Sequence, residues 1–302
     1  MTVRSCTSCA CPDVRIVEPR DGLVYDVCPS CGHCERVNLA GDTQDPFDDA
    51  QARYYGSDSP VLAVRVSPFE AEALKTRKRI VSRILAPESA VLEVGPGAGA
   101  FLSWLSARGH HVSAVEQSPH VAEHLASRLS ISVHVGEFEA VEIENGSVDA
   151  FCSFHVIEHV RNPARHLSRA FDLVKSGGCA FVATPNARSW EQRFFGSLSP
   201  NYDSAHLRVF SITSLRRMCA DAGWTVREVH TPEYASNWLR VATKCVRRIR
   251  GEHEEDTAGK YAVGDSKALR LCAFILSRLS LPLRFTQQVS GGGSELFFVL
   301  SK

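Results

Sequence analysis

The 302-residue sequence has no excess of charge of either sign and no long, uninterrupted run of apolar residues. Lysine and arginine total 34, as do aspartate and glutamate, so no global electrostatic field would steer the chain to nucleic acid. No uncharged apolar run reaches the ~18 residues that cross a bilayer, and none follows the first basic residue as in a signal peptide. We therefore expect a cytoplasmic protein with no nucleic-acid partner and no membrane span.

A glycine-rich turn is the most informative feature that the sequence does contain. Glu93 precedes Gly95, Gly97 and Gly99, and the turn lies between an apolar run and a helical pattern. Glycines allow a tight turn and a close approach of the backbone to a ligand. The spacing is G-x-G-x-G, whereas dinucleotide-binding proteins have G-x-G-x-x-G. A carboxylate beside the turn favours a cationic cofactor without phosphate over a pyrophosphate, which binds to bare amide donors.

Acidic residues follow the next two predicted strands. Glu116 ends the second strand, about 20 residues after the glycine turn, where an acid can accept hydrogen bonds from both hydroxyls of a ribose. Glu137 and Phe138 follow the third strand. A carboxylate next to an aromatic ring suits an adenine, because it offers a hydrogen-bond acceptor for the amine and a face for stacking. This pattern predicts a cofactor that contains a nucleoside.

Several segments carry a resemblance to a known family: E-V-G-P-G-A-G (93–99), V-E-Q-S (115–118), G-E-F (136–138), H-V-I-E-H-V (155–160), L-V-K-S-G-G (173–178) and T-P-N (184–186). The chain resembles class I S-adenosylmethionine-dependent methyltransferases, specifically the small-molecule group that includes the ubiquinone-biosynthesis type. The resemblance runs from about residue 75 to about residue 224. It implies an α/β, Rossmann-like fold with a seven-stranded sheet and an antiparallel last strand.

The resemblance also implies roles for individual residues. Glu93 would lie near the methionine amino group of S-adenosylmethionine, and the three glycines would form the wall beneath the cofactor. The other implied cofactor contacts are the ribose-binding Glu116 with its neighbour Gln117, the adenine-framing Glu137 and Phe138, and Phe154 at the end of the fourth strand.

Six of the eleven cysteines precede residue 40. Cys6-x-x-Cys9 and Cys28-x-x-Cys31 each form a potential knuckle, and two knuckles complete a tetrahedral zinc site. A ribbon this small buries too little surface to fold unaided, so the metal would supply most of its stability. A disulfide-rich segment is the alternative, and a cytoplasmic location disfavours it. Other potential ligands lie nearby: Cys11, His33 and Cys34.

The expected domains are a zinc ribbon at 1–40, an acidic connector at 41–67 and a methyltransferase domain at 68–302. An insertion at about 234–290 separates the last two predicted strands and contains a basic amphipathic helix followed by an apolar stretch. It is expected to form a helical cap, a lid over a hydrophobic acceptor or a peripheral contact with a membrane surface.

Methyl transfer requires alignment of the nucleophile, the methyl carbon and the sulfur, and a hydroxyl acceptor also requires a base. His155, after the fourth strand, and His206, on the long loop after the fifth, are the candidate bases. We expect methyl transfer to a small-molecule acceptor, most simply an oxygen, in a specialised biosynthetic pathway. The alternatives are a sugar C-methyltransferase, a zinc-ribbon RNA methyltransferase and a scaffold that binds the cofactor inertly. The oligomeric state is left open.

Overall fold

The computed structural model describes residues 5–20, 23–37, 68–196, 199, 201–202, 205–235, 237–238, 275 and 278–302. The chain divides into two compact units. The sheet unit contains Ala52–Ala183, Met218–Val229 and Phe297–Lys302. The ribbon unit contains Met1–Gln51, Thr184–Arg217 and His230–Leu296. The predicted connector, and most of the predicted basic helix and apolar stretch of the insertion, lie outside the described residues.

Seven strands form one sheet in the order β10-β11-β8-β7-β4-β5-β6. Their bounds are β4 Ala90–Val94, β5 His111–Glu116, β6 Ser132–Val135, β7 Val148–Phe154, β8 Val174–Pro185, β10 Thr225–His230 and β11 Glu295–Ser301. Strands β6, β5, β4, β7 and β8 are parallel neighbours. Lys302 N–H donates to Gly178 O, and Asn186 N–H donates to Ser294 O, so β11 runs antiparallel to β8. The sheet confirms the predicted class I methyltransferase fold.

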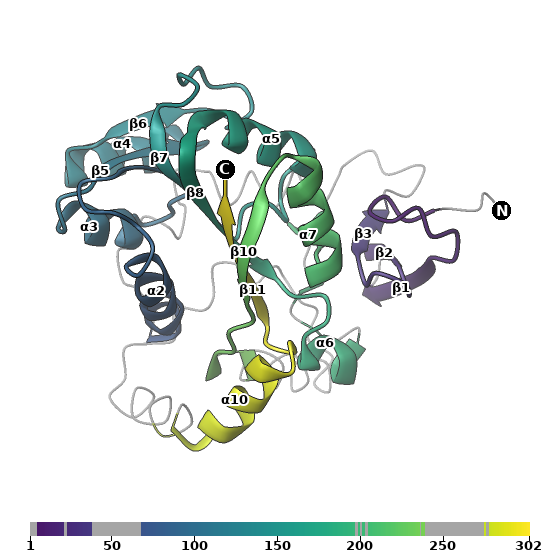
Figure 1. The fold of residues 1–302 in the computed structure, drawn as a ribbon. Helices are drawn as coiled ribbons and strands as arrows, with labels where there is room; N and C mark the ends of the chain where they lie inside the picture. The colour runs from purple at the N-terminus through teal and green to yellow at the C-terminus, as the bar shows by residue number, and fades with distance from the viewer. Residues whose placement is uncertain are drawn as a thin grey trace. The chain divides into compact units, whose positions relative to one another are not determined.

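Helices α3 Ala100–Ser106 and α4 Pro119–Leu129 connect β4 to β5 and β5 to β6, and α5 Pro163–Leu173 connects β7 to β8. Helix α2 Pro68–Val81 precedes β4, and α7 Ile212–Asp221 precedes β10. Helix α4 begins with Ser118 as its N-cap, whose hydroxyl accepts the amide of Val121, and a proline follows at the first helical position. Apolar side chains of α2 and α3 pack with those of β4, β7 and β11 into a buried core. Figure 1 shows α2 and α3 close together at one edge of the sheet unit. The core fixes the carboxyl ends of the strands, where the predicted site residues lie.

The ribbon unit contains a second, smaller sheet in the order β1-β2-β3-β9. Its strands are β1 Arg15–Arg20, β2 Leu23–Val27, β3 Cys34–Val37 and β9 Arg208–Val209. The residues between the two cysteine pairs predict a hairpin of residues 14–17 and 23–27, which corresponds to β1 and β2, and these strands pair antiparallel. Strands β3 and β9 have no counterpart in the sequence prediction, and β9 comes from a segment more than 170 residues further along the chain. Among the described residues, helices α6 Trp190–Phe195 and α10 Leu281–Val289 also belong to this unit.

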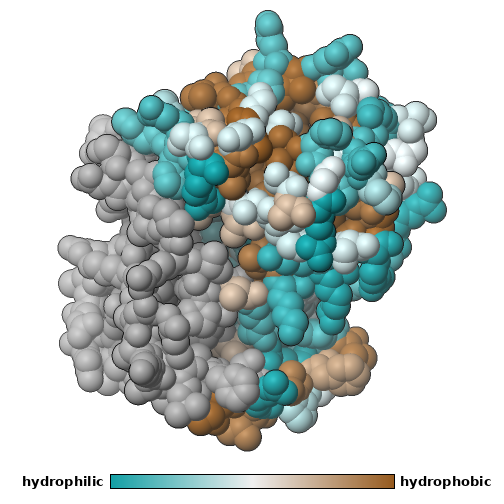
Figure 2. Space-filling view, turned by 90° about the vertical axis from the view of Figure 1, so that its left-hand side faces the viewer, coloured by the Kyte–Doolittle hydropathy of each residue, from teal (hydrophilic) through white to brown (hydrophobic). Residues whose placement is uncertain are grey.

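Helix α10 lies inside the predicted insertion and leaves large apolar side chains exposed. Phe285 is 68% exposed and Val289 is 72% exposed, and Leu281 and Leu283 are also exposed. In Figure 2, hydrophobic side chains gather at the lower edge of the molecule, the level at which Figure 1 draws α10. Within the described part of the chain, no helix combines the length and apolar character needed to cross a bilayer.

Candidate active site and metal centre

The predicted cofactor residues of the sheet unit lie at the carboxyl ends of adjacent parallel strands. Strand β4 ends at the glycine turn, β5 ends at Glu116, β6 ends just before Glu137, and β7 ends just before His155. The pairing of β4 with both β5 and β7 places these ends side by side. Because the strand order reverses direction at β4, this edge is where an open α/β sheet binds its ligand.

Glu93 is a buried carboxylate at this edge. It is 3% exposed, and its Oε2 has no hydrogen-bond partner among the described residues. Burial raises the pKa of Glu93 to about 8, and the positive charge of Arg77 opposes this shift only in part. A buried carboxylate oxygen without a partner is costly unless a donor meets it. The side chain therefore fits the ammonium group of a cofactor.

The three glycines all adopt the left-handed backbone conformation, with φ of 63° at Gly95, 55° at Gly97 and 70° at Gly99. Other residues rarely take this conformation, so the turn requires glycine. A Cβ at Gly95 would lie 2.7 Å from Val156 Cγ2, whereas a Cβ at Gly97 would meet no atom within 4 Å. The turn is thus packed at Gly95 and open at Gly97.

Glu116 is buried, and a backbone amide donates a hydrogen bond to one of its carboxylate oxygens. Its Oε1 accepts the amide of Ser118 at 3.0 Å. Burial raises the pKa of Glu116, and the amides of Ser118 and Gln117 oppose this shift. The Gln117 side chain is exposed beside it. This arrangement leaves the carboxylate at the strand end predicted to bind a ribose.

The two aromatic residues predicted to contact the cofactor have buried rings. The Phe138 ring lies 5.3 Å from the ring of Phe151 and 5.0 Å from that of His166. The Phe154 ring stacks on Phe297 at 5.8 Å. Both rings therefore belong to the core, and a cofactor contact of either residue stays a prediction, whereas Glu137 between the strand and the ring is exposed.

The sequence did not indicate the buried contacts that His166 makes with Glu139 and Ser153 next to Phe138. His166 is fully buried, with its Nδ1 2.8 Å from Glu139 Oε1 and its Nε2 3.2 Å from the hydroxyl of Ser153. Burial opposes ionisation of Glu139, but the hydrogen bond and charge of His166 outweigh it and lower the pKa of Glu139. No spacing in the sequence links these three residues. His166 thus connects Glu139, in the segment that follows β6, to Ser153 on β7.

His155 follows β7 in an unusual backbone conformation. Its φ is 57°, a left-handed value that costs roughly 1 kcal/mol or more outside glycine and that clusters at functional sites. Its Nδ1 lies 3.2 Å from Oε1 of Glu158, whose carboxylate is fully buried. Because a carboxylate accepts, Nδ1 carries the proton and Nε2 is the basic nitrogen of the neutral ring. Glu158 thus orients the candidate base.

His206 lies in the ribbon unit and is held in a similar way. Its Nδ1 is 2.8 Å from the carbonyl oxygen of Asn201, which can only accept, so Nε2 is again the basic nitrogen of the neutral ring. Its own carbonyl accepts the hydroxyl of Tyr25 at 2.8 Å. His155 and His206 belong to different units.

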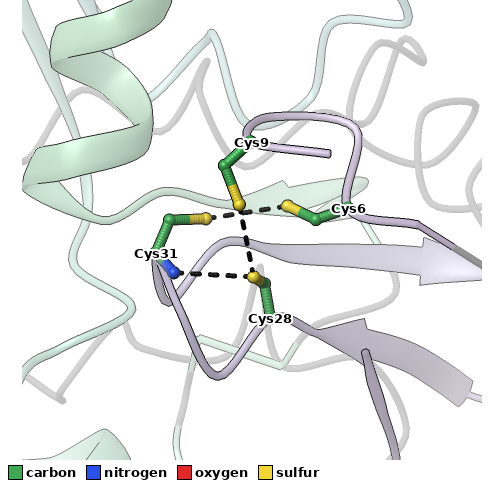
Figure 3. A group of neighbouring side chains, drawn as sticks. All are labelled: Cys6, Cys9, Cys28 and Cys31. Atoms are coloured by element: carbon green, nitrogen blue, oxygen red, sulfur yellow. Dashed lines mark hydrogen bonds between the residues drawn. The ribbon is translucent and has the colours of Figure 1, made fainter. Parts of the chain in front are cut away.

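Four cysteines meet in the ribbon unit. The Sγ atoms of Cys6, Cys9, Cys28 and Cys31 lie within 4.8 Å of one another and point toward a common centre (Figure 3). The Cys6–Cys31 and Cys9–Cys28 sulfur pairs are each 3.6 Å apart, too far for a disulfide. A tetrahedral zinc ion with Zn–S bonds of about 2.3 Å sets its sulfurs about 3.8 Å apart. The donor set therefore fits zinc.

The other potential ligands lie outside this group. The Cys34 thiol donates to the carbonyl oxygen of Gly32, and burial raises its pKa to about 12. His33 is buried against the ring of Phe210, and neither ring nitrogen has a hydrogen-bond partner among the described residues. Cys11 is half-buried, and its backbone carbonyl accepts the amide of Cys6.

The sheet and its glycine turn define a protein of the class I methyltransferase fold. The chain belongs to the family described as "Methyltransferase domain", which matches residues 69–229. The matched residues include the glycine turn and the ends of β5, β6 and β7.

Individual proteins agree with this family at low identity. The chain is 26% identical over 148 residues to a "Ubiquinone biosynthesis O-methyltransferase" of Xanthomonas campestris, covering 47% of this chain and 60% of that protein. A "Probable S-adenosylmethionine-dependent methyltransferase" of Mycolicibacterium smegmatis is 26% identical over 156 residues, covering 50% of this chain and 59% of that protein. The chain thus spans about 60% of the length of these curated relatives.

Among solved structures, the 1,6-didemethyltoxoflavin-N1-methyltransferase of Burkholderia thailandensis aligns with a TM-score of 0.52 at 14% identity. The alignment covers 95% of this chain and 99% of that one, whose structure contains bound 1,6-didemethyltoxoflavin and S-adenosylhomocysteine. At this identity the comparison supports the fold alone.

Proposed function

We propose that the chain transfers a methyl group from S-adenosylmethionine to a small-molecule acceptor, with oxygen as the receiving atom, in a specialised biosynthetic pathway. The observation that carries the cofactor proposal is the Glu93 side chain, a buried carboxylate next to a glycine turn with one oxygen that has no hydrogen-bond partner among the described residues. S-adenosylmethionine has an α-ammonium group to meet it and no phosphate. The family match and the named methyltransferase relatives support the same cofactor.

Bound at this edge, the cofactor supplies a sulfonium methyl group as the electrophile. Glu93 would bind the ammonium group, the glycine turn would accept the methionine portion without Cβ contacts, and Glu116 would accept the ribose hydroxyls. Glu137, exposed after β6, would meet the adenine amine, with Gln117 beside it. These contacts position the methyl group, which is the main task in a direct displacement.

Oxygen is proposed as the acceptor atom because a hydroxyl needs a base and two imidazoles are held in the tautomer that a base requires. In each, Nδ1 carries the proton and Nε2 is basic, through Glu158 at His155 and through Asn201 at His206. Separate His155→Ala and His206→Ala variants would distinguish them once an acceptor is found. The residue whose loss lowers turnover at least tenfold without weakening cofactor binding is the base.

We also propose that Cys6, Cys9, Cys28 and Cys31 bind one zinc ion. The distances between their sulfurs support tetrahedral coordination, and a small ribbon gains stability from a structural metal. The proposed partner is a small-molecule acceptor, and we propose no nucleic-acid partner. A peripheral membrane contact through the insertion stays a prediction, and co-sedimentation with neutral and anionic vesicles would test it.

Native mass spectrometry of the purified chain, with and without S-adenosylmethionine, tests both proposals. We expect a mass increase for one zinc ion and, on addition of cofactor, for one S-adenosylmethionine. Calorimetry with the same ligand gives its affinity. Zinc without cofactor binding would contradict the methyltransferase proposal and favour a scaffold, whereas cofactor without zinc would contradict the metal proposal alone.

A further inference from the structure

The segment that carries His206 is built into the cysteine-bearing ribbon. We refer to residues 205–211 as the His206 segment. Its strand β9 pairs antiparallel with β3, with Cys34 opposite Val209 and Glu35 opposite Arg208. The amide of Arg36 also donates to the carbonyl oxygen of Leu207 at 2.9 Å. The His206 segment therefore contains the fourth strand of the ribbon sheet, although it lies far from the ribbon in sequence.

Side chains reinforce this pairing at both ends of the segment. Tyr25, on β2, is fully buried and donates its hydroxyl to the carbonyl oxygen of His206 at 2.8 Å. At the other end, the hydroxyl of Ser211 donates to the carbonyl oxygen of Cys31 at 2.5 Å. Cys31 is one of the four clustered cysteines, so this contact joins the His206 segment directly to the proposed metal centre.

An ion pair and an apolar cluster complete the connection. Arg208 and Glu35 form an ion pair at 2.8 Å, with both side chains largely shielded from solvent. Tyr25 also packs its ring 4.9 Å from that of Tyr202, in a buried cluster that includes Val209 and Cys34. These contacts tie the segment to the ribbon sheet next to His206. Precise placement of a site residue depends on such support.

We infer that the zinc ribbon positions His206, with Tyr25 as the positioning residue. The ribbon fixes the backbone of His206 through Tyr25, while Asn201 fixes its ring through Nδ1. Metal binding would hold the Cys28–Cys31 knuckle, and through Ser211 and β3 it would hold the His206 segment. The inference rests on the proposed function only where it gives His206 a chemical role. The mechanical link between the ribbon and the His206 segment stands without it.

Tyr25→Phe in the full-length, zinc-loaded protein tests the inference. The substitution removes one hydroxyl and keeps the ring in its apolar cluster. We expect amide hydrogen exchange within residues 205–211 to become about fivefold faster, the effect of losing one hydrogen bond. Tyr234→Phe is the matched control, because it removes another buried tyrosine hydroxyl of the same unit, bonded to Glu295 Oε1 at 2.9 Å. It should leave exchange in residues 205–211 unchanged.

Two further readouts separate positioning from general loosening. The 15N spectrum of the His206 ring should show the Nδ1–H tautomer in the wild type and a mixture in Tyr25→Phe. Bound zinc should stay at one ion per chain in both tyrosine variants. Unchanged exchange and an unchanged tautomer in Tyr25→Phe would overturn the inference.

Removing the metal from the wild type with a chelator gives an independent arm. We expect faster exchange in residues 205–211 and unchanged exchange in β4 and β7 of the sheet unit. Equal exchange of residues 205–211 in zinc-loaded and chelated protein would overturn the role of the metal. Because neither readout uses turnover, a failed methyltransferase assay would leave this inference intact. If exchange in residues 205–211 stays slow both in Tyr25→Phe and after zinc removal, the inference is overturned whatever the activity.

Discussion

Replacing Glu93 with glutamine is expected to stabilise the cofactor-free protein at alkaline pH. Burial raises the pKa of Glu93 to about 8, well above the value of about 4.3 in an unfolded chain. A group whose folded-state pKa is raised contributes its full stability below the unfolded value and loses it as the pH rises through the folded value. Each pH unit between these values costs about 1.4 kcal/mol. Between about pH 6 and pH 9, the wild type should therefore lose about 3 kcal/mol that Glu93→Gln retains.

Urea unfolding of both proteins, followed by circular dichroism across this pH range without cofactor, measures the difference. Glu233 has a pKa raised to about 8 by burial and by the negative charge of Glu191, and it is present in both proteins. Its contribution cancels when the two free energies of unfolding are subtracted. Parallel stability curves for the wild type and Glu93→Gln would refute the buried, unpartnered carboxylate and the cofactor proposal that depends on it.

Three further expectations concern the stability of the glycine turn, cofactor binding and metal binding. Gly97→Ala should cost about 1 kcal/mol of stability through its left-handed backbone alone. Gly95→Ala should cost more, because its Cβ would also meet a valine side chain at 2.7 Å. Thermal unfolding of the two variants compares these costs, and equal costs would contradict the close packing at Gly95. Glu116→Gln should weaken S-adenosylmethionine binding about tenfold or more, as measured by calorimetry, and unchanged affinity would remove its ribose role. Cys6→Ser should lose bound zinc and Cys34→Ser should keep it, by elemental analysis; the reverse would change the ligand set.

The sequence predicted the sheet unit well because its signals are local. The apolar runs of the sequence predict strands at 148–154, 295–301 and 90–94, which match β7, β11 and β4 at both ends. Each is a short apolar run closed by glycine or a polar residue, the pattern of a strand buried on both faces. The acids that end β5 and follow β6 then fall at one sheet edge, because parallel neighbours place their carboxyl ends together.

The sequence could not predict the ribbon sheet beyond its first hairpin. Strand β9 has two residues and β3 has four, too few for a periodic pattern to stand out. Their pairing joins segments far apart in the chain, and such contacts depend on the folded topology rather than on local propensity. The cysteine spacing identified the metal-binding knuckles, yet nothing in it indicated that the same ribbon holds the His206 segment.

Phe138 shows how the same residue type can satisfy two different patterns. An aromatic ring next to an acid suggests adenine stacking, which contributes about 0.5–1.5 kcal/mol beyond the area it buries. Full burial of a phenylalanine side chain contributes about 1.5–3 kcal/mol, and it does so whether or not a cofactor is bound. Phe138 is 3% exposed and its ring contacts those of Phe151 and His166, so the larger, permanent gain is present without a cofactor. The exposed Glu137 would offer a hydrogen bond to the adenine amine, and a contact of the base with Phe138 stays a prediction.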